Sequence, residues 1–403
     1  MKILFLCNKS PWPPKEGGPM AMNMIINGLT SAGHQVKVLA VNSFKYHITT
    51  AEIPSSYHEM TGIELIEVDL RLKPADALLN LLSGKSYHVS RFSTDNFRTR
   101  LAEVLKSTKF DIVQLETLFM CPYIETIRKH TDAKIILRAH NIEHVIWQRI
   151  AHDTKNPVKR WYIRHLAGTL KNYEQKIIRE TDGIVAITGQ DAAYFRGVME
   201  VQSAVVPVID IPFGLNPDNY DDSFEMVDFP SLFSLGSMNW IPNQEGIRWF
   251  LQYVWPKVHN QFPDLKYYLA GREMPEWMQT LKLPNVVVLG EVEDARRFLA
   301  SKAIMVVPLF AGSGIRVKII EGMAAGKTII STGIGAEGIH YMHRENILIA
   351  DTHDDFFGMI SICVTNIDLC SKIGKQARML IETEYDAKIL TQKLLAFYQQ
   401  VAG

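Results

Sequence analysis

Net charge, cysteine and long apolar stretches are all scarce in this sequence. Lysine plus arginine and aspartate plus glutamate each number 43, so the formal net charge at pH 7 is zero. Nucleic-acid binding through a bulk basic field is therefore not expected, because affinity for phosphate needs clustered cations. The cysteines Cys7, Cys121, Cys363 and Cys370 form neither a CxxC motif nor a zinc-ligand spacing. They favour a reducing compartment, with Cys7 as a buried thiol.

Hydrophobic runs are short throughout the chain. No stretch reaches the roughly 18 uninterrupted apolar residues that predict a transmembrane helix. The apolar run after Lys2 is too short for a signal peptide and shows no cleavage site. We therefore expect a cytoplasmic protein, with peripheral contact to the inner face of a membrane left open.

What the sequence does contain is a regular alternation of strand-length and helix-length segments. Apolar, β-branched runs alternate with amphipathic segments, which is typical of parallel sheets with crossover helices. Two such series predict an α/β protein with two Rossmann-like domains. The first series has predicted strands at Ile3–Cys7, Gln35–Val41, Ile63–Val68, Ile112–Leu115, Lys134–Arg138 and Gly183–Ile187. The second has predicted strands at Ser231–Leu235, Lys266–Ala270, Val286–Leu289, Ile304–Pro308, Thr328–Ser331 and Ile347–Ile349.

The boundary between the two series lies in a segment rich in proline, glycine and aspartate, from Pro207 to Pro230. We predict an N-terminal domain over residues 1–210, a linker over residues 211–230 and a C-terminal domain over residues 231–383. The tail, residues 384–403, is amphipathic and is predicted to form a helix that packs back toward the N-terminal domain.

The segment Gly312–Gly326 carries the strongest functional pattern. A loop of small residues follows a predicted strand and leads into a helix. Free N–H groups and the positive end of the helix dipole favour an anion there. Arg316 and Lys318 stand at that same end, where cations cost stability unless an anion is bound. Glu321, one turn further, suits a pair of ribose hydroxyls. The segment therefore predicts nucleotide-diphosphate binding, and the alternative is a tight structural turn with solvated charges.

This segment resembles the donor site of glycosyltransferase family 4. The resemblance covers nearly the whole chain and is weakest across residues 45–110. Its further motifs are Gly17-Gly18, His140-Asn-Ile-Glu143, Gly236-Ser-Met-Asn-Trp-x-x-Asn243, Leu269-Ala-Gly271, Leu289-Gly-Glu291 and Gly335-Ala-Glu-Gly338. The resemblance implies the GT-B fold, with two Rossmann-like domains that face each other across a cleft: an N-terminal acceptor domain and a C-terminal donor domain.

The activity implied is retaining transfer of a hexose from a nucleotide-sugar donor in glycan or polysaccharide biosynthesis. A UDP- or GDP-sugar would be the co-substrate, without a further cofactor. The acceptor would be a glycan, a lipid-linked molecule or a small molecule. Two other functions stay open: a catalytically silent nucleotide-sugar-binding protein of the same fold, and a GT-B nucleotide-sugar epimerase.

The chain departs from the family at two places in the donor site. Family members usually carry two glutamates eight positions apart; Glu321 matches the second, but Ser313 replaces the first. Many members also carry an arginine and a lysine where this chain has Ser237 and Asn243. We infer that Arg316 and Lys318 take over the charge of the diphosphate. The predicted donor-binding residues are Gly17, Gly18, Gly312, Ser313, Gly314, Ile315 and Glu321.

In the first half, the paired glycines do not have the GxGxxG spacing, which disfavours NAD binding. His140 matches the family's histidine at the reaction centre, and it is predicted to be catalytic together with Arg316 and Lys318. Glu116 is either an acceptor-side carboxylate or a charge at a helix N-terminus. Asn141 is a second acceptor-side candidate.

Three further expectations concern aromatic residues, metals and an ambiguous segment. Trp240, in a loop after a strand, is a cleft candidate, whereas tryptophans at helix positions such as Trp161 are expected to pack in the core. No DxD-like cluster follows a strand, so no metal site is predicted. Lys73–Arg98 is either a helix packed on the sheet, centred on Ala77–Leu82, or a lid or membrane-adjacent acceptor surface.

Overall fold

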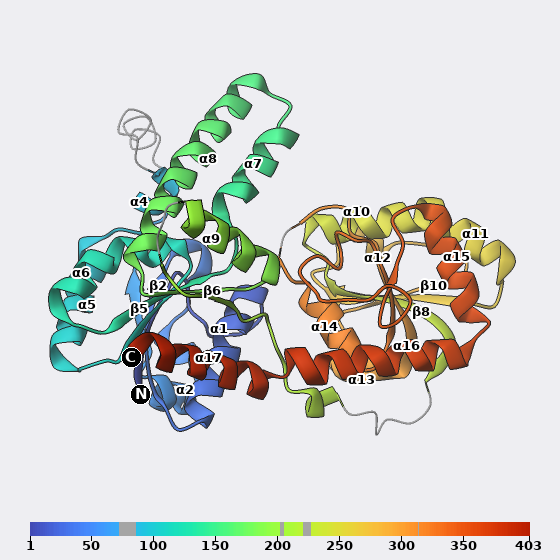
Figure 1. Ribbon diagram of the computed structural model, residues 1–403. Helices are drawn as coiled ribbons and strands as arrows, with labels where there is room; N and C mark the ends of the chain where they lie inside the picture. The colour runs from blue at the N-terminus through green and yellow to red at the C-terminus, as the bar shows by residue number, and fades with distance from the viewer. Residues whose placement is uncertain (72–85, 202–204, 221–226, 313) are drawn as a thin grey trace. The chain divides into compact units, whose positions relative to one another are not determined.

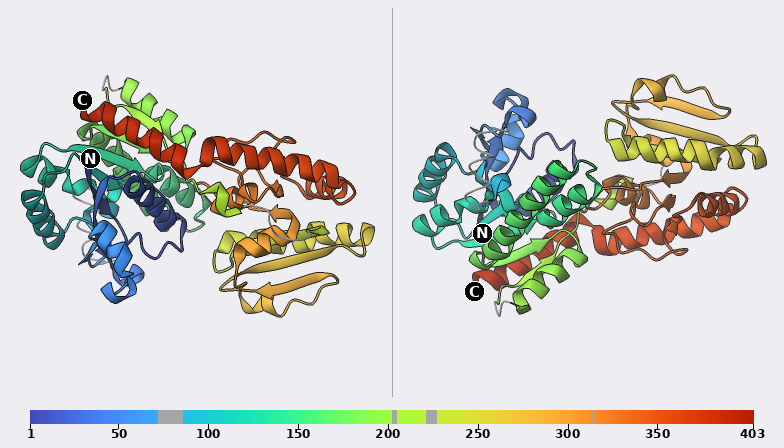
Figure 2. Two further views of the ribbon diagram at one scale, coloured as in Figure 1. Left: turned by 90° about the horizontal axis from the view of Figure 1, so that it is seen from below. Right: turned by 90° about the horizontal axis from the view of Figure 1, so that it is seen from above.

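The computed structural model describes residues 1–71, 86–201, 205–220, 227–312 and 314–403, which divide into two units (Figure 1). Unit 1 comprises Met1–Phe213 and Leu390–Gly403, and unit 2 comprises Gly214–Ile389. Each unit contains one parallel sheet with helices packed around it (Figures 1 and 2). The predicted α/β class, with two strand series, is confirmed.

The sheet of unit 1 has seven parallel strands in the order β3-β2-β1-β4-β5-β6-β7. They are β1 (Lys2–Cys7), β2 (Gln35–Asn42), β3 (Glu64–Glu67), β4 (Ile112–Glu116), β5 (Lys134–Ala139), β6 (Gly183–Ala186) and β7 (Val208–Asp210). Six of them match the predicted strands. The seventh, β7, was missed because its three residues lie between Pro207 and Pro212, in a segment whose composition is typical of a linker.

The helices of unit 1 begin at sequence features that favour a helix start. Thr94 caps one of them by accepting a hydrogen bond from the backbone N–H of Phe97, and Asn156 caps another, with Pro157 in its first turn. The α-helices are α1 (Gly17–Ser31), α2 (Ser55–Thr61), α4 (Tyr87–Ser90), α5 (Asp95–Ser107), α6 (Ile124–His130), α7 (Glu143–Asp153), α8 (Pro157–Ile177), α9 (Gly189–Val201) and α17 (Ala387–Ala402).

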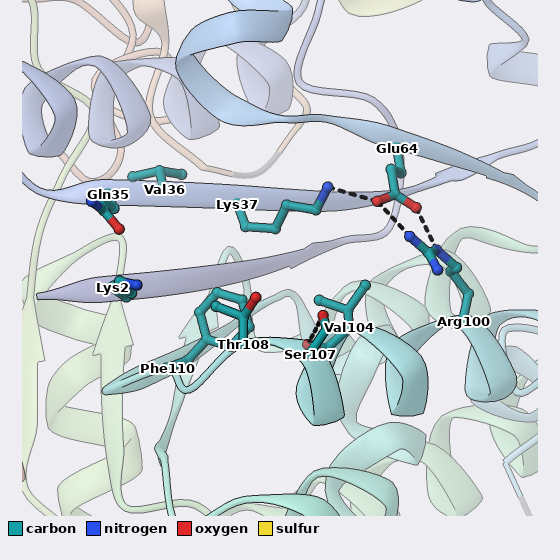
Figure 3. A pocket seen from close by; sticks show the side chains of 10 residues that line it. All are labelled: Lys2, Gln35, Val36, Lys37, Glu64, Arg100, Val104, Ser107, Thr108 and Phe110. Carbon is teal, nitrogen blue, oxygen red and sulfur yellow. Dashed lines mark hydrogen bonds and ion pairs between the residues drawn. The ribbon is translucent and has the colours of Figure 1, made fainter.

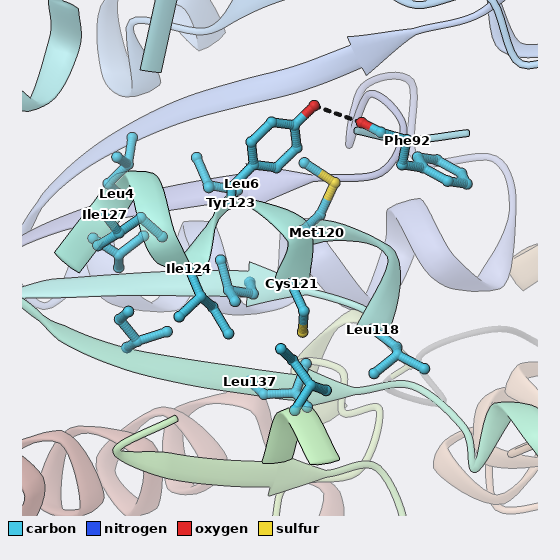
Figure 4. Close-up of a cluster of buried hydrophobic side chains, with 14 of the residues drawn as sticks. Leu4, Leu6, Phe92, Leu118, Met120, Cys121, Tyr123, Ile124, Ile127 and Leu137 are labelled. Carbon is cyan, nitrogen blue, oxygen red and sulfur yellow. Dashed lines mark hydrogen bonds between the residues drawn. The ribbon is translucent and has the colours of Figure 1, made fainter. Parts of the chain in front are cut away.

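An apolar cluster fills the space between the sheet of unit 1 and the segment that follows β4 (Figure 4). Leu6 and Leu137 contribute from the strands, and Met120 comes from a short 3-10 segment, Leu118–Tyr123. The one polar atom of Tyr123 is satisfied, because its hydroxyl donates to the carbonyl of Phe92 at 2.5 Å. This packing fixes the carboxyl ends of β4 and β5, where the polar residues of unit 1 gather.

Unit 2 has a six-stranded parallel sheet in the order β10-β9-β8-β11-β12-β13. Its strands, all predicted, are β8 (Asp228–Ser237), β9 (Lys266–Arg272), β10 (Val286–Gly290), β11 (Lys302–Val307), β12 (Thr328–Ser331) and β13 (Leu348–Ile349). Its α-helices are α10 (Ile241–Trp249), α11 (Trp255–Gln261), α12 (Glu276–Gln279), α13 (Ala295–Ser301), α14 (Val317–Ala324), α15 (His353–Val364) and α16 (Ile367–Leu380).

The segment predicted as a linker is partly ordered into regular elements. Within residues 211–230, the described part contains a 3-10 segment, Pro217–Tyr220, and the beginning of β8 at Asp228. The tail helix α17 contributes its residues from Leu390 onward to unit 1. There the hydroxyl of Thr391 lies so close to Gly28 of α1 that a Cβ on this glycine would come within 2.1 Å of it.

The predicted helix at Ala77–Leu82 lies outside the described residues, so only the flanks of Lys73–Arg98 are described, with α4 and the start of α5 among them. Over the parts of the chain that the structure does describe, no single helix is long and apolar enough to span a membrane. The pair His353–Val364 and Ile367–Tyr385 meets that criterion jointly, by length and composition only, but bends by 107°.

Candidate active site

Open parallel sheets bind ligands at the carboxyl ends of the strands where the strand order reverses. In unit 2 this point lies between β8 and β11, because β9 and β10 continue on one side and β12 and β13 on the other. The loop after β8 and the loop between β11 and α14 therefore meet at the same edge. Most of the residues predicted for donor binding lie in these two loops and in the first turns of α14.

The loop before α14 is held in a conformation that only glycine adopts easily. Gly312 and Gly314 have φ angles of 126° and 77°. A Cβ on Gly312 would come within 2.7 Å of the Arg316 guanidinium and 3.0 Å of the Trp240 ring. Arg316 is the N-cap residue of α14, and its guanidinium lies 5.6 Å from the centroid of Trp240. The structure thus brings Trp240, Gly312 and Arg316 together. Ile315 is half-buried beside them, and Ser313 lies outside the described residues.

Lys318 reaches from α14 to the loop after β8. Its Nζ donates to Oδ1 of Asn243 at 2.7 Å, and Nδ2 of Asn243 donates to the carbonyl of Ser237 at 2.8 Å. Gly236 makes room for Asn243, since a Cβ there would lie 3.2 Å from its Nδ2. Sequence reasoning named Asn243 as a departure from the family, but it could not show that Lys318 occupies the neighbourhood of that position.

The electrostatics of this pair favour a bound anion. Lys318 is half-buried and hydrogen-bonds to a neutral amide. Burial first, and the charge of Arg316 second, lower the pKa of Lys318 from 10.5 to about 7. Two cations therefore stand close together at the start of a helix, where the dipole also disfavours positive charge. Negative charge placed between them would offset the burial of the Lys318 ammonium, its repulsion by Arg316 and the unfavourable helix dipole.

Glu321 lies one turn further along α14. Tyr220 donates a hydrogen bond from its hydroxyl to Oε1 of Glu321 at 3.1 Å, and the Arg296 guanidinium lies 5.4 Å from the centroid of the Tyr220 ring. Burial raises the pKa of Glu321, although the hydrogen bond from Tyr220 opposes the shift. Sequence reasoning missed Tyr220, because it lies in the segment taken as a linker and nothing in its sequence surroundings suggests a contact 101 residues away.

In unit 1 the strand order reverses between β1 and β4, and the polar residues lie at that edge. Cys7 of β1 is in register with Glu116 of β4, which is in register with Arg138 of β5. His140 follows β5 directly, and its Nε2 lies 2.6 Å from Oε2 of Glu116. Arg138 is fully buried and holds the same oxygen with Nη1 at 3.3 Å. Two of the predicted residues, Glu116 and His140, are thus brought together.

Glu116 is the last residue of β4, two positions before the 3-10 segment Leu118–Tyr123, and its side chain has no exposed surface. Burial alone would raise the pKa of Glu116, but the charge of Arg138 and the hydrogen bond to His140 outweigh it, and the pKa is lowered. Glu116 is therefore a buried carboxylate that orients His140, whose side chain is 13% exposed.

The remaining unit 1 candidates flank these residues. α1 begins at Gly17; a Cβ on Gly17 would meet open space, whereas one on Gly18 would lie 3.3 Å from Cε of Lys9. Asn141 is half-buried just before α7. Burial and the charge of Glu174 raise the pKa of Glu143 to about 7, against a hydrogen bond with Asn141 that lowers it.

Glu143 and His144 both make contacts at the start of α7. The backbone N–H of Glu143 donates to Oε1 of Glu174 at 3.0 Å, and Nδ1 of His144 pairs with Oε2 of the same carboxylate. Glu174 thus satisfies the first turn of α7 from the neighbouring helix α8.

A cavity of about 270 Å³ lies at the opposite edge of the unit 1 sheet, near the amino ends of β1 and β2 (Figure 3). Two of its cations already have a carboxylate partner, because Glu64 pairs with Lys37 at 2.6 Å and with Arg100 at 2.6 Å. The location and the paired charges argue against this cavity as the active site. No group of three or more His, Cys, Asp or Glu side chains in the described ranges is placed to hold a metal ion.

Comparisons with known proteins support the fold described above. Residues 230–366, most of unit 2, match the family described as Glycosyl transferases group 1. Sucrose-phosphate synthase from Thermosynechococcus elongatus has a similar structure, with a TM-score of 0.69 and 14% identity over 100% of this chain and 99% of that one. Anabaena HepE in complex with UDP gives a TM-score of 0.66 and 12% identity, over 99% of this chain and 100% of that one.

A curated relative matches over a similar length. An uncharacterized 44.6 kDa protein in the cps region of Klebsiella pneumoniae is 25% identical over 399 residues, which cover 96% of this chain and 97% of that protein. The fold and the two switch-point edges place the chain in the GT-B class of two-unit α/β proteins. The match of residues 230–366 to the group 1 glycosyl transferases agrees with the family that the sequence resemblance predicted.

Proposed function

We propose that the chain transfers a hexose from a UDP- or GDP-sugar to an acceptor hydroxyl with retention of anomeric configuration, in the synthesis of a glycan or polysaccharide. A nucleotide-sugar donor is supported by the structural similarity to HepE in complex with UDP. A polysaccharide pathway is supported by the relative in a cps region. At 12% and 25% identity these two proteins are too distant to assign a substrate to this chain, so the proposal rests on this chain's own residues.

The observation that carries the proposal is the pair of cations at the start of α14. Cleavage of the anomeric C–O bond leaves negative charge on the departing diphosphate. Arg316 and Lys318 stand where the free N–H groups of the Gly312–Ile315 loop and the positive end of the helix dipole also act on that charge. Burial and the charge of Arg316 lower the pKa of Lys318 to about 7, so its ammonium gains from a nearby negative charge. The developing phosphate charge would supply that stabilisation in the transition state.

Glu321 is proposed to bind the ribose of the donor. Its carboxylate is held by Tyr220 through one oxygen, which leaves the second oxygen to accept hydrogen bonds from vicinal hydroxyls. In unit 1, His140 is proposed to contact the donor sugar. The carboxylate of Glu116 holds its Nε2, so the ring is oriented and Nδ1 remains to meet a ligand. Metal-independent action, with these protein cations in place of Mg²⁺, stays part of the proposal.

The test is a comparison of substitutions in the candidate site with matched substitutions elsewhere on unit 2. Lys318→Met and Arg316→Gln should each lower kcat/KM for transfer by roughly 10²-fold, as expected when one stabilising contact to a transition-state charge is lost. Lys282→Met and Arg297→Gln, both at exposed positions of unit 2, should leave it unchanged. Equal activity of the site and control variants would refute the assignment.

The same assay separates the alternatives. A silent binder would raise its melting temperature with a nucleotide sugar by mass action but release no nucleoside diphosphate. An epimerase would convert one nucleotide sugar into another without any acceptor. The anomeric configuration of the product, read by NMR coupling constants, tests retention.

A further inference from the structure

Helices α7 and α8 form an antiparallel pair that projects from the rest of unit 1 (Figure 1). Residues 154–156 join them, and we call residues 148–165 the hairpin tip. Three large apolar side chains of the tip face outward: Ile150 is 41% exposed, Trp161 is 60% exposed and Val158 is 74% exposed. The expectation that Trp161 packs in the core is therefore wrong.

The exposed apolar residues do not belong to the packed face of α8. That face is formed by buried Ile163, Leu166 and Leu170. Val158 and Trp161 are three positions apart, so they share one side of the first turns, and the Trp161 ring stacks with His165 at a centroid distance of 6.3 Å. Apart from this stacking, Trp161 presents most of its ring to solvent.

The charges around these residues are almost all positive. Residues 148–172 hold six lysines or arginines and a single acid, Asp153, in a chain whose net charge is zero. Lys155, Lys159 and Arg164 are exposed on and next to the tip. The first turn of α8 contains no acidic residue, although acids are favoured there. The tip is thus an apolar patch surrounded by cations.

We propose that the hairpin tip docks on a membrane surface that contains anionic lipids. Tryptophan prefers the boundary between headgroups and acyl chains, and lysine or arginine next to it pairs with anionic headgroups. A second copy of the chain fits this surface poorly, because a symmetric contact would bring two positive tips together. The contact is independent of the donor site, since it requires neither Arg316 nor Lys318, so the proposed function and this inference fail separately.

The experiment is co-flotation of the full chain with vesicles. The wild-type protein should float with vesicles of phosphatidylcholine mixed with phosphatidylglycerol, and much less with phosphatidylcholine alone. Lys159→Gln combined with Arg164→Gln should weaken partitioning about 30-fold, as each cation near an anionic surface contributes about fivefold. Trp161→Ser combined with Val158→Ser should reduce it as well. Circular dichroism and donor hydrolysis in solution should be unchanged in both variants.

Matched controls use exposed residues of unit 1 away from the tip. Lys106→Gln with Lys129→Gln removes two cations from α5 and α6, and Phe44→Ser removes an apolar side chain that is 84% exposed. These controls should float like the wild type. The proposal is overturned if the wild type does not float, if it floats equally without anionic lipid, or if tip and control variants behave alike. Self-association in solution that Trp161→Ser abolishes would instead make the tip an interface between copies, and would also overturn it.

Discussion

The sharpest consequence of the donor-site geometry is that binding should be coupled to proton uptake at Lys318. Burial and the charge of Arg316 lower its pKa to about 7. A diphosphate places negative charge beside the ammonium, so the pKa in the complex should return toward 10.5. The phosphates of a nucleotide sugar are diesters and do not titrate near neutral pH. Any proton taken up near pH 8 therefore belongs to the protein.

The magnitude follows from the titration of one group. At pH 8, about one-tenth of Lys318 is charged before binding, so the complex should take up about 0.9 proton. At pH 6, about nine-tenths is already charged, and uptake should fall to about 0.1 proton. The affinity should accordingly decrease about tenfold per pH unit above 7 and become constant below about 6.

Isothermal titration calorimetry measures this directly. The donor is chosen from a thermal-shift panel of UDP- and GDP-sugars, and the binding enthalpy is recorded in buffers that differ in ionisation enthalpy. The slope of enthalpy against ionisation enthalpy gives the number of protons. Lys318→Arg is the matched variant: its guanidinium stays charged, so uptake at pH 8 should vanish while binding persists. A wild-type slope near zero at pH 8 would refute the reasoning.

Three more predictions follow from single contacts. Gly246→Ala places a methyl group 1.8 Å from the backbone oxygen of Pro308, and urea unfolding should show the free energy of unfolding lowered by about 2–3 kcal/mol. The control is Gly168→Ala on α8, where the methyl group meets open space and should raise the free energy of unfolding by about 0.5–1 kcal/mol. Glu116→Gln leaves a buried arginine without its carboxylate and should cost about 3–5 kcal/mol in urea unfolding; a loss under about 1 kcal/mol would contradict the buried pair. Because the folded pKa of Glu116 is lowered, its stabilisation should be present above about pH 4.5 and be lost as the pH falls through the folded value. Tyr220→Phe removes the hydrogen bond that opposes the raised pKa of Glu321, so the decrease of donor affinity toward low pH should begin at a higher pH than in the wild type; superimposable pH profiles of Kd would count against a ribose carboxylate.

The strand pattern could be predicted because buried parallel strands appear in sequence as short apolar runs. Ile304–Pro308 was predicted from such a run, and β11 lies there. The missed strand β7 has only three half-buried residues, so proline and glycine around it dominated the local signal. Strand identity was thus visible wherever burial was complete.

The site was predictable only as far as its residues are neighbours in sequence. The glycine loop with Arg316 and Lys318 is one continuous segment. Small residues and cations at the start of a helix predict an anion site from the sequence alone. The contact between Lys318 and Asn243 spans 75 residues, and that between Glu116 and His140 spans 24. These pairs arise from strand order, which composition and spacing do not encode. The prediction that Trp161 packs in the core was wrong for a related reason. A position within a helix does not show which face of that helix packs against the rest of the protein.

The length of α7 has a consequence for the choice of acceptor. The helix starts three residues after His140 and runs for 11 residues without glycine or proline, so it spans about 16 Å at 1.5 Å per residue. With the proposed contact of the hairpin tip to a bilayer, α7 would set the scale of the distance between the lipid headgroups and the histidine. A lipid-linked acceptor would then have to bridge a distance of up to that order, so the length of one helix would limit which acceptors can reach His140.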